Sequence, residues 1–262
     1  MTTARVRQMK REGEKISMLT SYDFTLASLV DEAGVDIILV GDSASNVVCG
    51  NQTTLPITLD EMIFLTKGVV RAAKHALVVA DMPFGTYQIS EEDAVRNAVR
   101  MLQLSGCDAI KMEGGEDILP AIRHIISAGI PVCGHLGLTP QSVNQFGGYG
   151  LRAKEEAEAQ KLLHDAKLLD EAGCFCIVLE KIPADLAAEV TKAVSCPTIG
   201  IGAGNQTDGQ VLVLHDMLGL NQGFKPKFLR HFAHLADTVK GAVGEYVAAV
   251  KNASFPSAEE SY

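Results

Sequence analysis

Short, continuous apolar runs recur along the chain, separated by longer stretches with helical periodicity. The runs lack the alternation of apolar and polar residues that marks a strand with one face in solvent. They are typical of strands buried on both faces of a parallel sheet. We therefore predict eight strands, over Ile16–Thr20, Ile37–Gly41, Leu77–Asp81, Ala109–Glu113, Pro131–His135, Ile177–Glu180, Thr198–Gly202 and Val211–His215.

Signals for helix starts and ends lie between the predicted strands. Residues Thr58–Glu61 have the form of a capping box, and Ser90–Asp93 make a similar start. A glycine closes several helices shortly before a strand, where a helix C-cap favours a left-handed residue. These glycines are Gly34, Gly106, Gly129 and Gly173. The alternation predicts repeated units of strand and helix.

The number of units and the chain length favour a (β/α)8 TIM barrel. Eight units in 262 residues average about 33 residues each, and such barrels typically need about 250 residues. The main rival, an open doubly wound sheet, normally has a Gly-rich turn after its first strand, whereas Ser21–Asp23 follow here. We predict a single domain over residues 1–262, with residues 252–262 as a C-terminal extension. Met1–Glu14 are expected to form a helix that closes the bottom of the barrel.

Composition and charge exclude several classes of protein. The formal net charge of −9 has the wrong sign for a surface that binds nucleic acid or anionic lipid. The N-terminus lacks the apolar segment of a secretory signal, and no apolar run reaches the roughly 18 residues of a membrane span. We expect a cytoplasmic protein, with a trimmed organellar leader as the alternative. The six cysteines show no metal-binding spacing and are interpreted as reduced apolar residues.

Acidic residues stand where several predicted strands end, which is the edge that carries the active site in this class of barrel. They are Asp42, Asp81, Glu113 and Glu180. Crowded carboxylates repel one another unless a proton or a cation lies among them, and an oxygen-only set suits Mg²⁺. We predict a divalent metal at Asp42, Asp81 and Glu113. The alternative for each acid alone is a helix cap or a hydrogen bond to a loop.

Two basic residues also belong to predicted strands. Lys111 lies within Ala109–Glu113, and His135 ends Pro131–His135. Lys111 shares a strand face with Glu113, which predicts either a structural salt bridge or a cation for an anionic substrate. His135 is equally open to a structural role or a functional one. The glycine-rich segment Gly200–Asn205 could bind a phosphate, but we favour a close approach of a ligand to its backbone.

A set of motifs that runs through nearly the whole chain resembles the ketopantoate hydroxymethyltransferase family. The most specific is the block from His135 to Ser142. The motifs are Gly41-Asp42-Ser43, Thr54-Leu55-Pro56, Ala80-Asp81-Met82-Pro83-Phe84, Lys111-Met112-Glu113-Gly114-Gly115, Gly134-His135-Leu136-Gly137-Leu138-Thr139-Pro140-Gln141-Ser142, Phe146-Gly147-Gly148-Tyr149, Leu179-Glu180, Gly200-Ile201-Gly202-Ala203-Gly204 and Phe255-Pro256.

The resemblance implies a phosphoenolpyruvate/pyruvate-type barrel and an enzyme of pantothenate biosynthesis. Such an enzyme transfers a hydroxymethyl group from 5,10-methylenetetrahydrofolate to 3-methyl-2-oxobutanoate and forms 2-dehydropantoate through a Mg²⁺-stabilised enolate. It implies a homo-oligomer, commonly a decamer. The implied roles are Mg²⁺ ligands for Asp42, Asp81 and Glu113, keto-acid contacts for Asp42, Ser43, Asp81 and Lys111, and proton acceptor for Glu180. We also predict a substrate contact for His135.

Two segments depart from the family pattern, and two other functions remain open. Ala44-Ser45-Asn46 and Gly150 differ from the residues common in the family, which puts the local loop shape in doubt. The first alternative function is a metal-dependent C–C lyase or phosphonomutase of the related isocitrate lyase type. The second is a barrel that binds a 2-oxo acid without turnover, which would require a damaged site.

Overall fold

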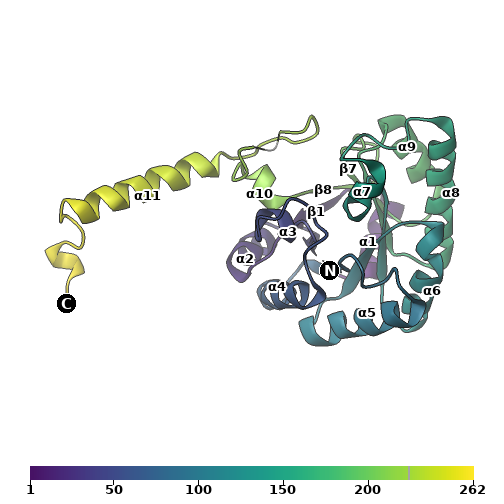
Figure 1. The fold of residues 1–262 in the computed structure, drawn as a ribbon, viewed down its shortest axis with the longest axis horizontal. Helices are drawn as coiled ribbons and strands as arrows, with labels where there is room; N and C mark the ends of the chain where they lie inside the picture. Colours follow the sequence, from purple (N-terminus) through teal and green to yellow (C-terminus); the bar gives the residue numbers. More distant parts are fainter. Residues whose placement is uncertain (224) are drawn as a thin grey trace. The chain divides into compact units, whose positions relative to one another are not determined.

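The computed structural model describes residues 1–223 and 225–262. The chain divides into two compact units, Met1–Val213 and Leu214–Tyr262, and each is described by itself. Within the described residues of the first unit, eight parallel strands pair in chain order and close into a barrel (Figure 1). The strands are β1 Ile16–Thr20, β2 Ile37–Val40, β3 Leu77–Asp81, β4 Ala109–Glu113, β5 Val132–Gly137, β6 Cys176–Glu180, β7 Thr198–Ile201 and β8 Gly209–Leu212. The predicted TIM barrel is confirmed.

Helices follow the strands and surround the barrel, as Figure 1 shows. Short helices α3 and α7 and two 3-10 turns lie in the loops after strand ends. The bounds in the first unit are α1 Thr3–Glu12, α2 Phe24–Glu32, α3 Ala44–Val47, α4 Leu59–Ala72, α5 Glu91–Ser105, η1 Glu116–Ile118, α6 Leu119–Ser127, η2 Pro140–Ser142, α7 Val143–Phe146, α8 Glu156–Ala172 and α9 Ala184–Ala193.

The predicted helix caps are confirmed by their hydrogen bonds and backbone angles. The Glu61 side chain accepts a hydrogen bond from the backbone N–H of Thr58 at 2.8 Å, and the Thr58 hydroxyl accepts from the backbone N–H of Glu61. Ser90 caps α5 through the backbone N–H of Asp93. The glycines predicted to end helices, at positions 34, 106, 129 and 173, all have positive φ.

Strand bounds differ from the prediction most at the last strand. We predicted Val211–His215, but β8 spans Gly209–Leu212, and His215 lies in helix α10, Leu214–Met217. Gly209 pairs with both neighbouring strands, and a Cβ there would lie 2.4 Å from the carbonyl oxygen of Ile16. A glycine is required at this close approach, and it does not extend an apolar run. The pattern therefore concealed the start of the strand.

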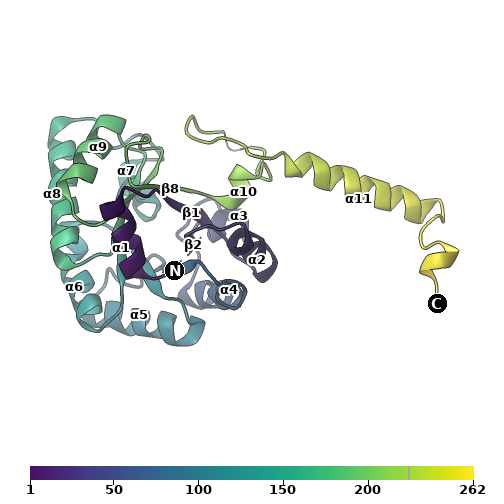
Figure 2. The same cartoon turned by 180° about the vertical axis from the view of Figure 1, so that it is seen from behind.

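Helix α1 covers the amino end of the barrel, as predicted, and Figure 2 shows it on that side. Its buried residues Val6 and Met9 join the core cluster formed by the strands. Lys10 forms an ion pair with Asp208 at 3.0 Å and donates to two backbone carbonyls. Apolar burial and these polar contacts together fix α1 on the barrel.

The second unit begins with α10 and contains α11, Leu235–Lys251, and η3, Ala258–Glu260. The predicted extension, residues 252–262, lies in this unit, and the single domain over the whole chain stays a prediction. In the described parts of the chain, no helix is both long enough and apolar enough to cross a membrane.

Candidate active site

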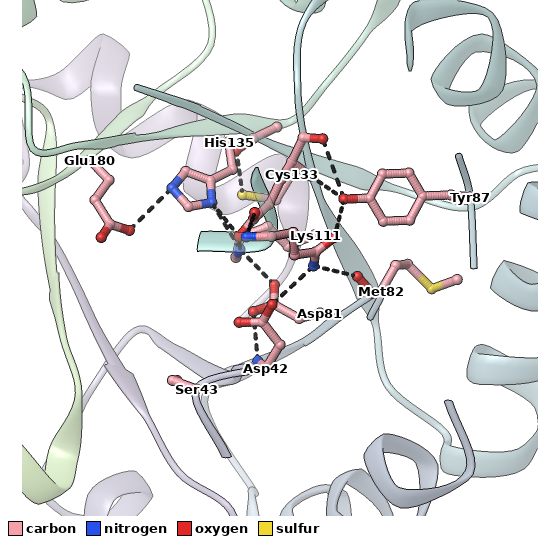
Figure 3. Close-up of polar contacts among 12 residues, drawn as sticks. Asp42, Ser43, Asp81, Met82, Tyr87, Lys111, Cys133, His135 and Glu180 are labelled. Carbon is pink, nitrogen blue, oxygen red and sulfur yellow. Dashed lines mark hydrogen bonds and ion pairs between the residues drawn. The ribbon is translucent and has the colours of Figure 1, made fainter. Parts of the chain in front are cut away.

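The carboxyl ends of β2 to β6 bring the predicted site residues together. Asp81 and Glu113 end β3 and β4, while Asp42 lies just after β2. The sheet register pairs Asp81 with Lys111 and Glu113 with His135 on neighbouring strands. These five side chains are buried. In Figure 3, Lys111, Asp81 and Asp42 lie below His135, and Glu180 lies to its left. Glu180 ends β6, and its side chain keeps 18% of its exposure.

Lys111 is the cation closest to the buried carboxylates. Its Nζ lies 2.8 Å from Asp81 Oδ1, 3.9 Å from Glu113 Oε1 and 3.2 Å from His135 Nδ1. Burial lowers the pKa of Lys111, but the surrounding carboxylates outweigh it and raise the pKa above its ordinary value. Lys111 therefore carries its charge at neutral pH. It forms the structural salt bridge that was one of its two predicted roles. The other role, contact with an anionic substrate, stays a prediction.

Asp42 and Asp81 lie next to each other with an excess of negative charge around them. The backbone N–H of Asp42 donates to Asp81 Oδ2 at 2.9 Å. Burial, with Glu113 and Asp81 nearby, raises the pKa of Asp42 well above its ordinary value. Burial also raises the pKa of Asp81, although Lys111 opposes the shift. An added cation at this position would relieve the repulsion between the two carboxylates.

His135 lies between a buried carboxylate and a more exposed one. Its Nδ1 is 3.2 Å from Glu113 Oε1, and its Nε2 is 3.3 Å from Glu180 Oε2. Burial and Lys111 lower the pKa of His135, but Glu113 and Glu180 outweigh them and raise it to about 9. Burial raises the pKa of Glu113, and His135 and Lys111 bring it below its ordinary value. His135 is thus a cation at neutral pH that can donate from both ring nitrogens.

Ser43 lies beside the cluster, and its hydroxyl is 2.8 Å from that of Tyr22. A Cβ at Gly41 would lie 2.7 Å from Ser43 Oγ, so the glycine gives the serine side chain its room. Ala44-Ser45-Asn46, which differ from the residues common in the family, form most of α3. Ser45 donates to the carbonyl of Thr53 at 2.7 Å, and Asn46 donates to that of Asn51 at 2.9 Å. Hydrogen bonds within the loop therefore fix its shape.

Two residues of the site were not assigned a role from the sequence. Tyr87 comes from the loop before α5, and Gln141 lies in η2; both are buried. Gln141 Nε2 donates to Asp42 Oδ2 at 2.9 Å, and its backbone N–H donates to Glu113 Oε2 at 2.9 Å. Gln141 is part of the motif that runs from His135 to Ser142, which was the one signal available. Nothing in the spacing indicated Tyr87.

The glycine-rich segment after β7 packs against the chain itself. A Cβ at Gly204 would lie 2.6 Å from the Cβ of Ala184, and one at Gly200 would lie 2.8 Å from Thr207 Oγ1. Packing accounts for Gly200 and contributes at Gly204, while Gly202 and Gly204 also have positive φ. A ligand close to this backbone stays a prediction.

Comparison with known proteins identifies the family. A model described as ketopantoate hydroxymethyltransferase matches residues 1–258. The chain belongs to this family. It is therefore an enzyme, a hydroxymethyltransferase, and the resemblance stated from the motifs is confirmed.

Relatives of high identity carry the same family activity in their names. Proteins of Porphyromonas gingivalis and Bacteroides fragilis, both named 3-methyl-2-oxobutanoate hydroxymethyltransferase, are 59% and 58% identical. Each match covers 100% of this chain and 96% of the relative. The ketopantoate hydroxymethyltransferase pattern is thus present over the full length of this chain.

Solved structures of low identity share the fold. A phosphonopyruvate hydrolase in complex with oxalate and Mg²⁺ has a TM-score of 0.63 at 14% identity, covering 99% of this chain and 93% of its own. A 2,3-dimethylmalate lyase has a TM-score of 0.61 at 18% identity, with coverage of 97% and 89%. At this identity the likeness shows the barrel fold alone.

Proposed function

We propose that this enzyme transfers a hydroxymethyl group from 5,10-methylenetetrahydrofolate to 3-methyl-2-oxobutanoate and forms 2-dehydropantoate through an enolate of the keto acid. The observation that supports the proposal most is the buried cluster of carboxylates and cations at the carboxyl end of the barrel, in a chain of this family. The substrate is an anion whose C3 proton must leave, so the site needs fixed positive charge and a base. Lys111 and His135 would supply the positive charge, and Glu180 would be the base.

The proposed metal is Mg²⁺, with Asp42, Asp81 and Glu113 as the residues that would hold it. Their donor atoms are all oxygens, the ligands that Mg²⁺ prefers. Burial, together with the charges of Glu113 and Asp81, raises the pKa of Asp42, so a cation beside it would be favoured. Within the residues described, no three acidic, histidine or cysteine side chains form a closed metal site. Mg²⁺ needs only one or two protein carboxylates, because it usually keeps several waters. When bound, Mg²⁺ supplies Lewis-acid stabilisation of negative charge on the keto oxygen, which is worth several kcal/mol.

The chain's own cations are proposed to orient the keto acid. Lys111, fixed by Asp81 at 2.8 Å, presents a charge that cannot be lost at neutral pH because its pKa is raised. The Ser43 hydroxyl, held by Tyr22, offers a neutral hydrogen bond at the same strand ends. These groups would bind the carboxylate and keto oxygens and aim the C3–H bond toward the base.

Glu180 is proposed as the base that accepts the C3 proton. It is the most exposed acid of the set, so its carboxylate can reach a bound substrate, and His135 Nε2 lies 3.3 Å from its Oε2. The histidine would orient one carboxylate oxygen and leave the other to accept the proton. The C3 electron pair would then form a bond to the one-carbon unit of the folate. Both carbon–nitrogen bonds of that unit would break, tetrahydrofolate would leave, and water would supply the hydroxyl oxygen of the product.

The deciding experiment is incubation with 3-methyl-2-oxobutanoate, methylenetetrahydrofolate and Mg²⁺, with the product identified by mass. Formation of 2-dehydropantoate supports the proposal. Exchange of the C3 proton with deuterated water in the absence of folate would show enolisation as a separate step. Cleavage of isocitrate-like acids, or keto-acid binding without any product, would instead support the lyase or the binding-protein alternative.

A homo-oligomer, commonly the decamer of the family, is proposed for the assembly. Phe24 and Leu29 on α2 and Phe64 on α4 are more than half exposed, at 55%, 58% and 75%, on two helices in contact. Exposed apolar side chains grouped in this way favour a protein interface. Mass photometry should give a species of several chain masses, and a monomer would contradict the proposal. A cytoplasmic location and the lack of nucleic-acid and membrane partners stay predictions.

A further inference from the structure

Gln141 contacts two of the proposed metal ligands through two different groups. Its backbone N–H donates to Glu113 Oε2 and its side-chain Nε2 to Asp42 Oδ2, both at 2.9 Å. The same Nε2 donates to the carbonyl of Met82 at 3.0 Å. Only 6% of Gln141 is exposed. One neutral residue therefore connects two carboxylates that come from different strands.

The amide of Gln141 has a single orientation that satisfies its neighbours. The Asp42 carboxylate and the Met82 carbonyl are acceptors, so they require the NH₂ group on their side. On the other side, Gln141 Oε1 accepts a hydrogen bond from the Tyr87 hydroxyl at 2.7 Å and a longer one from Gln88 Nε2 at 3.2 Å. The Tyr87 oxygen in turn accepts the backbone N–H of Glu113 at 3.1 Å. Tyr87 thus fixes the amide and the backbone of Glu113 together.

We propose that Gln141 is a positioning residue that holds the carboxylates of Asp42 and Glu113 in place for a divalent cation, and that Tyr87 fixes its amide. The inference rests on the proposed function, since it needs a cation at those acids. A neutral donor suits this role because it orients a carboxylate without cancelling the charge that the cation needs. Lys111 also binds a carboxylate of the set, but it adds a positive charge that competes with the metal.

The polarity of the amide also predicts which substitutions fail. Gln141→Met keeps the volume and removes the donor and the acceptor of the side chain, so Asp42 loses its neutral partner. Tyr87→Phe keeps Gln141 and removes the shorter of the two hydrogen bonds to its Oε1, while Gln88 keeps the longer one. Loss of such outer contacts typically weakens metal binding about 10-fold to 100-fold. We expect Mg²⁺ binding to weaken about 10-fold to 100-fold in Gln141→Met and about 10-fold or less in Tyr87→Phe.

The test is a calorimetric titration of Mg²⁺ alone into metal-free enzyme, with thermal unfolding in EDTA and the Mg²⁺ dependence of turnover. The matched control is Thr191→Val, which removes a buried hydroxyl that bonds Ala187 O and Thr198 Oγ1 away from the site. The positioning role predicts weaker Mg²⁺ binding in both site variants and unchanged binding in Thr191→Val. Saturating Mg²⁺ should restore part of the turnover of Gln141→Met, because mass action offsets weaker binding.

The outcomes separate this inference from the proposed function. If wild type binds Mg²⁺ and Gln141→Met binds it within about twofold, Gln141 has a structural role only and the inference is overturned. If Gln141→Met does not fold, unchanged Mg²⁺ binding by Tyr87→Phe overturns it. If wild type itself does not bind Mg²⁺, the proposed metal fails, and the inference fails with it.

Discussion

Aspartates at the amino end of the barrel differ sharply in their partners from the acids at the carboxyl end. At the amino end each carboxylate accepts hydrogen bonds from backbone N–H groups near the start of a strand. Asp31 accepts three, from residues 74, 75 and 76. Four other aspartates also accept a hydrogen bond from a backbone N–H near the start of β1, β3 or β7, namely Asp36, Asp108, Asp170 and Asp208. At the carboxyl end the partners are mainly other charged side chains.

The difference shows how one residue type serves stability at one end and chemistry at the other. Burial raises the pKa of Asp31 and of Asp170, but hydrogen bonds from the backbone outweigh it and lower both pKa values. Those donors carry no net charge and do not move. Burial raises the pKa of Asp42 and of Asp81 as well, and there the neighbouring like charges add to the shift, with Glu113 acting on both. The carboxyl end is thus left with charge that a ligand can compensate.

The largest expected effect is loss of activity in Asp42→Asn together with a gain in stability. The amide keeps the shape but removes a charged oxygen donor, so turnover should fall about 10³-fold. Burial, Glu113 and Asp81 disfavour the charged form of Asp42 in the folded chain, so the neutral residue should raise the thermal midpoint in EDTA. Asp36→Asn at the amino end is the control. Normal turnover in Asp42→Asn would show that this acid of the carboxyl end is not needed for the chemistry.

A second large effect is expected at Glu180, the more exposed acid of the carboxyl end. Glu180→Gln keeps the shape and cannot accept a proton, so turnover should fall about 10²-fold to 10⁴-fold. Binding of 3-methyl-2-oxobutanoate, measured by calorimetry with Mg²⁺, should stay close to that of wild type. Exchange of the C3 proton should be lost in parallel with turnover. Equal loss of binding and turnover would assign Glu180 to substrate binding instead.

The acids of the carboxyl end could be predicted from the sequence because all parallel strands of a barrel end at the same edge. Asp42, Asp81, Glu113 and Glu180 needed only the strand ends, and an error of one or two residues did not matter. The prediction could not show that His135 separates Glu180 from the other acids. That separation depends on side-chain direction.

Residues held by loops could not be predicted in the same way. Tyr87 and Gln141 reach the acids only because the loop before α5 and the turn η2 fold over the strand ends. Asp31 was missed for a related reason, since its role depends on which backbone N–H groups the sheet leaves without a strand partner. A periodic pattern of apolar residues carries no such information.

A smaller effect, on stability alone, is expected for Asp31→Ala. The change leaves three backbone N–H groups without their acceptor, and Asp31 is buried, so we expect a loss of about 3 kcal/mol in the free energy of unfolding. Urea denaturation measures it. Turnover at a temperature where the variant is folded should stay within about twofold of wild type. The exposed Glu171 gives a control, since Glu171→Ala should change neither quantity. A loss of turnover in folded Asp31→Ala would contradict the division of roles.

The smallest effect is the pH dependence of stability, and it should have opposite signs at the two ends. The folded pKa of Asp31 is lowered, so its contribution is full above the unfolded pKa of about 3.9 and is lost as pH falls through the folded value. The folded pKa of Asp42 is raised, so its charge destabilises the chain at high pH and the penalty disappears as pH falls through that value. Urea denaturation in EDTA from pH 7 to pH 3 should therefore show two trends. As pH falls, the deficit of Asp31→Asn should persist to about pH 4 and then shrink, whereas the gain of Asp42→Asn should begin to shrink already at a pH above 4. Parallel curves for the two variants would show that the acids at the two ends share one electrostatic environment, which would contradict the difference between the two ends.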